Sequence, residues 1–368
     1  MTYRVVHGGT GLTGREALRG IINDPALDLI GVLVTTADKV GVDAGSLCGL
    51  PDVGLLATDD VEAIVAAQPD CFCYCGTAVR RDDAAIEDMA RLLRAGINVV
   101  TISTIPMVYS PAAPQNWRDI VEAACREGHS SFYATGSEPG VASLNIPTAL
   151  LAGAGRVHSY RMDEYALGLD ETYPIWEVLH ESMGFGKPDG HVPARIASGK
   201  VRHDWETVVR YIADILGYHL DAIDLDWETV TAPTDLDTNI GILPAGTICA
   251  HRWQLAGKVD GKAVTSVQYF ATVSSTPWPD AWPRPVAEAA SAVVYRVAGR
   301  PNMRMQLCFD AQDDEKNLNS AIALTGMAAV NAIPYVVDAE PGILDPIVDR
   351  GVVTRQAVGA RARTGTRT

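Results

Sequence analysis

Short apolar runs alternate with amphipathic stretches along the first third of the chain. Each apolar run has the length of one strand in a sheet that is buried on both faces. The runs lie around Val5 and at residues 27–34, 69–75, 98–104 and 131–136. The stretches between them space apolar residues as helices do, from Leu12 and at residues 60–67, 81–95 and 115–127. Alternation of this kind predicts an α/β domain with a doubly wound parallel sheet over residues 1–136.

The hydrophobic pattern changes to a period of two from about residue 157. Residues 247–255 and 263–273 alternate around Asp260-Gly261, and residues 293–298 and 303–309 flank a second turn. Two hairpins of this kind predict an α+β domain with a mostly antiparallel sheet over residues 137–316. The small and apolar residues from Asn317 to Ala332 predict a helix that ends at Pro334. We expect this C-terminal region, about 317–350, to pack back on the first domain.

Glycines at 9, 11 and 14 follow the first predicted strand and precede the first predicted helix. This is the Gly-x-Gly-x-x-Gly arrangement of Rossmann-type dinucleotide-binding folds, in which the backbone approaches a pyrophosphate at a helix N-terminus. The alternative is a glycine-rich turn that binds nothing. We favour the cofactor, and the predicted contacts are Gly9, Thr10, Gly11, Leu12, Thr13 and Gly14.

The end of the second predicted strand bears on the choice of cofactor. Many NAD-binding folds place an acid there to bond the ribose 2′-hydroxyl, but this chain first offers Thr35 and Thr36, with Lys39 close behind. Hydroxyls and a cation suit a 2′-phosphate, so the sequence favours NADP(H). Asp38 keeps NAD(H) as an alternative.

Charge and composition exclude several classes of function. The chain has 45 acidic and 30 basic residues, a formal net charge of −15, which argues against nucleic acid and against an anionic membrane surface as partners. No apolar run stands out as a membrane span, and the chain enters a strand at once without a signal-peptide pattern. The seven cysteines are irregularly spaced. We therefore expect a reduced, cytoplasmic enzyme that acts on a small molecule.

Cys71, Cys73 and Cys75 alternate along one predicted strand and first suggest a metal site. Alternate residues of a strand lie about 6.6 Å apart, so three thiolates in a row do not surround one ion. We therefore expect these thiols to pack as small apolar groups and expect no metal site.

The carboxyl ends of the predicted central strands supply further candidate contacts, because reactive sites of doubly wound sheets lie there. Cys75, Gly76, Thr77 and Ser103 are candidate cofactor contacts, and Thr104 is a candidate substrate contact. Glu138 follows the last of these strands and is either a loop carboxylate or an active-site acid.

A segment early in the second domain is rich in aromatic and titratable residues. His180 is a candidate catalytic acid because imidazole titrates near neutrality, although it could also be a surface histidine on a helix. Glu164 and Tyr165 are further catalytic candidates. Tyr165 and Tyr173 either donate from a phenol or line the pocket, and lining is favoured. The residues expected to line a substrate site are Tyr173, Trp176, Met183 and Phe185.

Several short stretches together resemble a dihydrodipicolinate-reductase-like family, akin to 2,4-diaminopentanoate dehydrogenase and the native amine dehydrogenases. They are Gly9-Thr-Gly-x-x-Gly14, Asp38-Lys-Val-Gly-x-Asp-Ala-Gly45, Leu47-Cys-Gly-Leu50, Asn98-Val-Val100, Pro139-Gly140, Met183-Gly-Phe-Gly186 and Val330-Asn-Ala-Ile-Pro334. The resemblance implies NAD(P)H binding and a homodimer formed through the second-domain sheet.

The chain departs from this family at two places. Dihydrodipicolinate reductases carry a His-His-x-x-Lys segment where this chain reads Asp163-Glu-Tyr-Ala-Leu167. The amine dehydrogenases carry a glutamate just after the Asn-Val-Val strand, where this chain reads Thr101-Ile-Ser-Thr-Ile-Pro-Met107. Lysine-biosynthesis chemistry is therefore not expected, and ammonia-dependent chemistry requires Glu138 or Glu164 to take the place of the family glutamate.

The sequence therefore predicts an NAD(P)H-dependent oxidoreductase that transfers hydride to a C=O or C=N bond of a small, fairly apolar substrate. One alternative is an ammonia-dependent amine dehydrogenase. The other is a catalytically silent, NAD(P)-binding sensor, since sites diverge on a shared fold.

Overall fold

The computed structural model describes residues 2–77, 81–274, 276–285, 289, 291–309 and 317–346, without the side chains of 317–319. The chain forms two compact units. The first unit contains Met1–Val141 and Ile322–Ile347, and the second contains Ala142–Ala321. Residues 347–350, the end of the expected C-terminal region, lie outside the described residues.

The first unit is built on a six-stranded sheet in the order β14-β5-β4-β3-β1-β2. Neighbouring strands are parallel throughout this sheet. The strands are β1 (Tyr3–Gly8), β2 (Leu27–Leu33), β3 (Cys71–Tyr74), β4 (Asn98–Thr101), β5 (Ser131–Ala134) and β14 (Gly342–Ile343). The helices are α1 (Leu12–Asn23), α2 (Ala44–Leu47), α3 (Val61–Ala66), α4 (Asp82–Arg94), α5 (Gln115–Gly128) and α10 (Asn317–Val337). The expected doubly wound, Rossmann-type sheet is confirmed.

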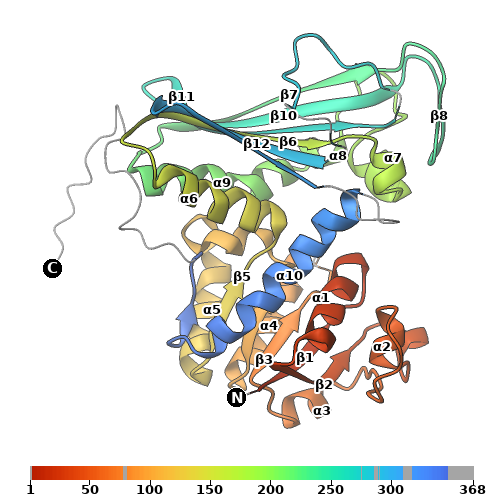
Figure 1. Cartoon of the computed structure of the whole chain (residues 1–368), viewed down its shortest axis with the longest axis vertical. Helices are drawn as coiled ribbons and strands as arrows, with labels where there is room; N and C mark the ends of the chain where they lie inside the picture. The colour runs from red at the N-terminus through yellow and green to blue at the C-terminus, as the bar shows by residue number, and fades with distance from the viewer. Residues whose placement is uncertain are drawn as a thin grey trace. The chain divides into compact units, whose positions relative to one another are not determined.

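Helix α10 packs beside α1 on this sheet, which completes the apolar core of the first unit (Figure 1). Val330 and Ile333 of α10 are buried in one cluster with Val5 of β1. The two helices approach closely because glycines face the contact. A Cβ on Gly20 would lie 2.6 Å from the Met327 sulfur.

Two expectations about this helix are wrong. It continues through Pro334 to Val337, because a proline removes one backbone donor and the buried Val336 still anchors the last turn. The segment Ser320–Val337 is also long and apolar enough to meet the length and composition of a membrane span. The apolar composition has another explanation here, since one side of the helix is buried in the core of the first unit.

The second unit contains a six-stranded sheet in the order β13-β12-β6-β11-β10-β7. All neighbouring pairs are antiparallel except β11 and β6, which are parallel. The strands are β6 (Arg156–Ala166), β7 (Ala222–Thr231), β10 (Ile248–Val259), β11 (Lys262–Thr272), β12 (Ser291–Arg300) and β13 (Met303–Cys308), with a separate hairpin of β8 (Leu236–Thr238) and β9 (Gly241–Leu243). The mostly antiparallel sheet is as expected, and both predicted hairpins, β10–β11 and β12–β13, are confirmed.

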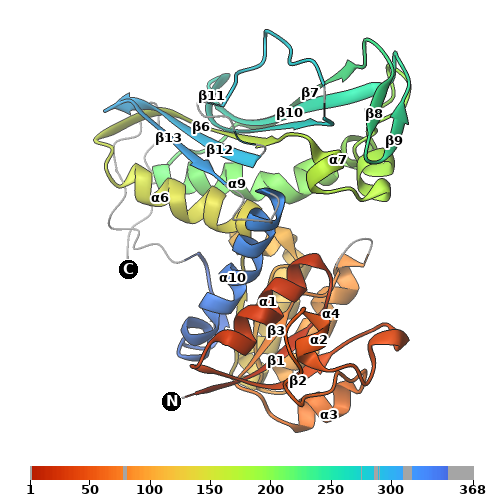
Figure 2. The same ribbon diagram turned by 45° about the vertical axis from the view of Figure 1, so that its right-hand side comes forward.

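Helices cover one face of this second sheet. They are α6 (Ile146–Leu151), α7 (Leu169–Thr172), η4 (Glu177–Ser182), α8 (Ala194–Ala197) and α9 (Lys200–Leu216), of which α9 packs along β10 and β11 (Figure 2). We call the side of the sheet that carries α9 the helix face and the opposite side the outer face. Because successive residues of a strand point to opposite sides, each strand contributes alternate residues to each face.

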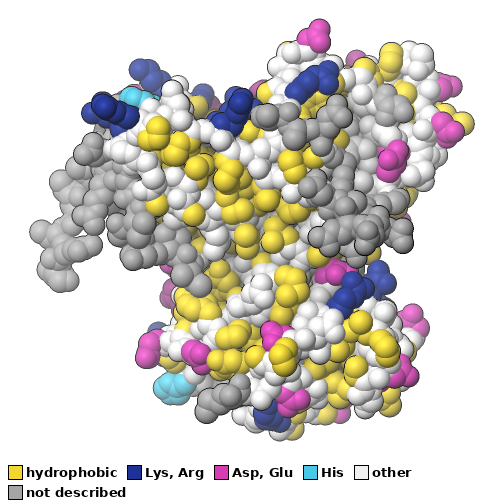
Figure 3. All heavy atoms as spheres, in the orientation of Figure 1, with side chains coloured by type: hydrophobic (Ala, Val, Ile, Leu, Met, Phe, Trp, Pro, Cys, Tyr) yellow, Lys and Arg dark blue, Asp and Glu magenta, His cyan; other side chains and the backbone are white. Residues whose placement is uncertain are grey.

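Acidic side chains are scattered over the surface that Figure 3 shows rather than gathered into one patch.

Candidate active site

The glycine loop, residues 8–14, joins β1 to α1 in the first unit. Gly9 has a φ of +96°, and a Cβ there would lie 2.4 Å from the Cys75 carbonyl carbon. A Cβ on Gly14 would lie 2.0 Å from the Gly9 carbonyl oxygen. A Cβ on Gly11 would meet nothing within 4 Å, so the backbone there borders open space. These are the three separate roles that a dinucleotide fingerprint assigns to its glycines, and the loop fits a nicotinamide dinucleotide.

The first turn of α1 faces this open space with free backbone donors. The helix begins after Gly11, no side chain among the described residues caps it, and its first turn holds no acid. The backbone N–H groups of Leu12 and Thr13 are therefore available to an anion, and the helix dipole favours one.

Lys39 connects the end of β2 to the glycine loop. Its Nζ donates to the Thr10 carbonyl oxygen at 3.2 Å and to the Thr10 hydroxyl oxygen at 3.0 Å. Thr35 and Thr36 follow β2 and are exposed. The structure thus brings the Lys39 ammonium group to the loop, and the roles of Thr35, Thr36 and Lys39 in cofactor binding stay a prediction.

The ends of β3 and β4 lie at the same edge of the sheet as the glycine loop. The Cys75 N–H donates to the Gly8 carbonyl oxygen at 2.6 Å. The Ser103 hydroxyl donates to the Gly76 carbonyl oxygen, which joins the two strand ends. The Thr77 carbonyl oxygen accepts from an Arg81 guanidinium N–H at 3.3 Å. The remaining residue of this edge, Thr104, is buried.

The second unit gathers titratable side chains on the helix face of its sheet. Glu164 of β6 lies in register beside Tyr269 of β11. His251 of β10 has its ring centroid 6.0 Å from that of Tyr269. The Arg195 guanidinium of α8 stands over the Tyr269 ring at 5.8 Å. We call Glu164, Arg195, His251 and Tyr269, together with Tyr173 near Arg195, the Glu164 cluster.

Burial sets the protonation states of the Glu164 cluster. It raises the pKa of Glu164 to about 8, although the Arg195 charge pulls it down. Burial, helped by Arg195, lowers the pKa of His251 to about 3. It also raises the pKa of Tyr269 and of Tyr173. At neutral pH the carboxyl is therefore protonated and the imidazole neutral, and Glu164 titrates close to neutrality.

Two atoms of this cluster have unused hydrogen-bonding capacity. The Oε2 of Glu164 and the Nε2 of His251 are buried and have no hydrogen-bond partner among the described residues. Aromatic rings surround them, since Phe185 lies 5.5 Å from His251 and Arg195 also stands over Trp205. Buried polar atoms of this kind are costly unless a ligand or water satisfies them, so they mark a candidate substrate site.

The predicted lining residues are distributed unevenly around this cluster. Phe185 contacts it, and Met183 is buried in the same segment. His180 stacks on Trp176 at 4.2 Å, and its Nδ1 donates to the Phe185 carbonyl oxygen at 2.7 Å. The other His180 nitrogen, Nε2, lies 3.6 Å from Glu181. These contacts fix the position of the imidazole rather than direct it at Glu164, and Trp176 is 46% exposed.

Tyr165 lies on the outer face, so the structure separates it from Glu164. Its hydroxyl donates to the Pro283 carbonyl oxygen at 3.0 Å, and its ring stacks on Phe270 at 4.9 Å. Consecutive strand residues must point to opposite faces, and only one of the two can belong to a given site. Of these two candidates, only Glu164 belongs to the Glu164 cluster.

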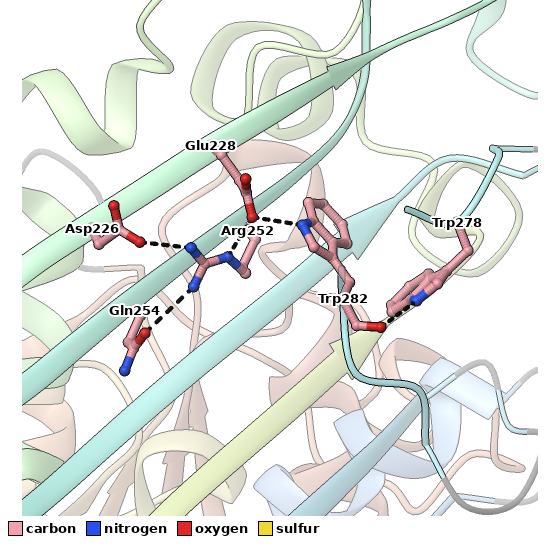
Figure 4. A network of polar contacts seen from close by, with 6 residues as sticks. All are labelled: Asp226, Glu228, Arg252, Gln254, Trp278 and Trp282. Atoms are coloured by element: carbon pink, nitrogen blue, oxygen red, sulfur yellow. Dashed lines mark hydrogen bonds and ion pairs between the residues drawn. The ribbon is translucent and has the colours of Figure 1, made fainter. Parts of the chain in front are cut away.

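The outer face also carries a network that the sequence did not reveal (Figure 4). Arg252 donates to Glu228 at 2.7 Å and to Asp226 at 2.6 Å. Glu228 also accepts from the Trp282 indole N–H at 2.6 Å, and the Trp278 indole N–H donates to the Trp282 carbonyl oxygen at 3.1 Å. The network holds two tryptophans of the loop that follows β11 against the sheet.

Glu138 belongs to the first unit. It follows β5 within the irregular helical segment Ser137–Asn145, and both of its carboxylate oxygens are shielded from solvent.

Sequence reasoning missed three residues that surround Glu164, namely Arg195, His251 and Tyr269, because they belong to no local motif. The register of the strands places Glu164 beside Tyr269, and helix α8 brings Arg195 over the Tyr269 ring.

No protein-family model matches the chain. An amine dehydrogenase from Streptomyces virginiae is 32% identical over 362 residues, which cover 96% of this chain and 97% of the relative. The solved structure of an amine dehydrogenase from Mycobacterium smegmatis matches with a TM-score of 0.70 at 19% identity, over 99% of this chain and 98% of that one.

A biliverdin reductase from Synechocystis sp. PCC 6803, solved with biliverdin and NADP+, matches with a TM-score of 0.50 at 12% identity, over 95% and 94% of the two chains. This likeness shows a shared fold, whereas the Streptomyces relative shows a family over almost the full length. This chain belongs to the amine dehydrogenase family and is an NAD(P)-dependent oxidoreductase.

Proposed function

We propose that the protein interconverts a small, mainly apolar ketone or aldehyde and ammonia with the corresponding amine, using a nicotinamide cofactor. The observation that carries this proposal is the buried carboxyl of Glu164, whose pKa is raised to about 8. In the family, the amine or imine is held by a glutamate after the Asn-Val-Val strand, and this chain has no acid there. Glu164 is the carboxyl that we assign to this role.

The electrostatics of the cluster suit an imine. A carboxyl that is protonated at neutral pH donates its proton to the imine nitrogen, which makes the imine carbon a better hydride acceptor. The carboxylate left behind is stabilised by the nearby Arg195 guanidinium, which already lowers the pKa of Glu164. The same positive charge disfavours a cationic amine, so the substrate enters with an uncharged nitrogen.

The reaction is balanced without any further reactant. The carbonyl compound and ammonia condense to an imine and water. Reduced nicotinamide, when bound, would supply the hydride to the imine carbon. Glu164 supplies the proton to its nitrogen and regains one from solvent before the next turnover. Aromatic rings around the cluster, including Trp205, Tyr269 and Phe185, favour a small apolar substrate and exclude water.

The proposed cofactor is NADP(H), with the glycine loop holding the pyrophosphate. The support for the 2′-phosphate is the ammonium group of Lys39 beside Thr10, with Thr35 and Thr36 exposed nearby. Asp38 is the residue that would favour NAD(H) instead.

We also infer a cytoplasmic homodimer that associates through the outer face of the second sheet. The support is the partly buried ring of Trp278, which packs over that face on a cluster that includes the buried Trp282. Light scattering coupled to gel filtration tests it, because Trp278→Ala would shift the mass from two chains towards one. A wild-type mass of one chain contradicts the inference.

The test of the reaction follows NADPH oxidation with a panel of ketones and aldehydes, with and without ammonium. We expect oxidation only with ammonium and formation of the amine by mass spectrometry. Glu164→Gln should lower kcat about 10²- to 10⁴-fold with little change in cofactor affinity. Glu181→Gln is the matched control, because Glu181 is an exposed carboxylate paired with Lys187.

Other outcomes separate the alternatives. Oxidation without ammonium would make the protein a carbonyl reductase. Cofactor binding without turnover on any substrate would favour the silent sensor. Full activity of Glu164→Gln would show that another group, with Glu138 the first candidate, supplies the proton.

A further inference from the structure

His7, Cys73 and Cys75 meet beneath the glycine loop of the first unit. One ligand atom from each residue lies within 4.8 Å of those of the other two. His7 belongs to β1, Cys73 belongs to the neighbouring β3, and Cys75 follows the end of β3. His7 and Cys73 are fully buried, and Cys75 is half-buried. The proposed reaction uses none of these side chains.

The three thiols of Cys71, Cys73 and Cys75 do not form the straight row expected along one strand. Cys71 and Cys73 do share one face and pack in the core. Strand β3 ends at Tyr74, however, and the turn after it returns the Cys75 Sγ to 3.8 Å from the Cys73 Sγ. Two thiolates bound tetrahedrally at about 2.3 Å from one ion have their sulfurs roughly 3.8 Å apart. The pair therefore already has the spacing of two ligands of one metal ion.

The histidine has the hydrogen bonding of a metal ligand. Its Nε2 lies 2.7 Å from the Gly9 carbonyl oxygen, which can only accept, so this nitrogen carries the proton. The lone pair is then on Nδ1, which is buried and has no hydrogen-bond partner among the described residues. Metal-binding histidines commonly donate their other N–H to a backbone carbonyl in this way, which fixes the ring and the tautomer.

Charge explains why an ion would be favourable in this place. Two buried thiolates alone carry two uncompensated negative charges, which a low-dielectric core penalises heavily. A divalent cation with two thiolates and a neutral imidazole has no net charge. Two sulfurs and one imidazole form a ligand set that zinc prefers.

We propose that His7, Cys73 and Cys75 bind one zinc ion, which ties the end of β1 to the end of β3 directly below the glycine loop. The ion would connect to that loop through two contacts already present. The Gly9 carbonyl oxygen holds the His7 ring, and the Cβ of Cys75 is 3.3 Å from where a Gly14 Cβ would stand. This site does not depend on the reaction proposed above.

The test measures metal in protein purified from zinc-supplemented cells, without chelators or an affinity tag. We expect about one zinc per chain in the wild type and in Cys71→Ala, and none in Cys75→Ala. Cys71 is the matched control because it lies on the same strand and outside the cluster. X-ray absorption of the wild type should show two sulfurs at about 2.3 Å and one nitrogen at about 2.0 Å from zinc.

Cobalt titration of the metal-free protein should produce a thiolate-to-cobalt charge-transfer band that Cys75→Ala lacks. Three outcomes would overturn the proposal: a wild type that binds neither metal, zinc that remains stoichiometric in Cys75→Ala, or a zinc shell without sulfur. A mass lower by two hydrogens in a metal-free protein would instead identify a disulfide and would also overturn it. Amine formation is measured on the wild type alone, so failure of the proposed reaction and failure of the zinc site can be told apart.

Discussion

The glycine loop and the Glu164 cluster consist of different chemical groups. The loop is backbone from a single stretch of chain, and what matters in it is space: 2.0 Å where a Gly14 Cβ would clash and nothing within 4 Å at Gly11. The cluster consists of ionisable side chains from separate elements, and what matters in it is protonation. Substitutions that add side-chain atoms should therefore disturb the loop, and a change of pH should hardly affect it. The cluster should instead change its protonation with pH, through Glu164.

The largest expected effect tests the loop. Gly14→Ala places a methyl group 2.0 Å from the Gly9 carbonyl oxygen, so it should weaken dinucleotide binding about 100-fold and lower the melting temperature. Gly11→Ala should also weaken binding but leave the melting temperature unchanged, because its methyl group enters the space that the pyrophosphate needs. Nicotinamide fluorescence and thermal unfolding measure both. If Gly11→Ala binds NADPH as the wild type does, the open space at Gly11 is not the phosphate site.

The next effect tests protonation in the cluster. The pKa of Glu164 is about 8 in the folded state and ordinary, near 4.5, in the unfolded chain, so between these values the folded state holds the extra proton. Stability should therefore fall as pH rises from about 4.5 to 8, by up to about 1.4 kcal/mol per pH unit. His251, whose pKa is about 3, acts oppositely and only below about pH 6.5.

Urea unfolding of the wild type and Glu164→Gln between pH 6.5 and 9 measures how much Glu164 contributes to the pH dependence of stability. The variant should lose the slope below pH 8, and Glu181→Gln should keep it. Equal slopes in wild type and Glu164→Gln would mean that the carboxyl is ionised in the folded protein.

A smaller effect concerns cofactor choice. Lys39→Ala removes the ammonium group beside Thr10 and should weaken NADPH binding about tenfold while changing NADH binding little. Asp38→Asn, next to it, is the control and should leave NADPH binding within about twofold. Equal losses for both nucleotides would indicate that Lys39 only supports the loop.

The smallest effect tests the two faces of the second sheet. Tyr165→Phe removes the hydrogen bond to the Pro283 carbonyl oxygen and should cost about 1 kcal/mol of stability with unchanged kcat. Chemical denaturation and steady-state kinetics measure the two quantities. A large loss of kcat would return Tyr165 to the list of catalytic groups.

The sequence predicted well those features that one continuous stretch of chain forms, because the residues that determine them lie within that stretch. The glycines at 9, 11 and 14 need only a strand before them and a helix after them, and the Asp260-Gly261 turn, with φ of 50° and 73°, needs only its own residues. Pro334 misled the prediction because the packing of α10 outweighed a local helix breaker.

The candidate substrate site is different, since nothing near Glu164 in the sequence indicates Tyr269 or Arg195. The parallel pairing of β6 with β11 brings Glu164 beside Tyr269. Tyr165 was misassigned for the same reason, because a difference of one residue reverses the face. The fold was therefore largely predictable from patterning, and the site was predictable only where it is a single stretch of chain.

The first unit has a consequence for how the protein is made. Its sheet is finished by β14 beside β5 and covered by α10, both of which come from Ile322–Ile347. A ribosome therefore releases the glycine loop long before the helix that shields Val5 and Ile21. The nascent chain must carry an unfinished nucleotide fold through synthesis of the whole second unit, and that period is when a chaperone is most needed. A chain truncated before α10 would lack the cover over Val5 and Ile21, so we expect it to be degraded faster than the full chain.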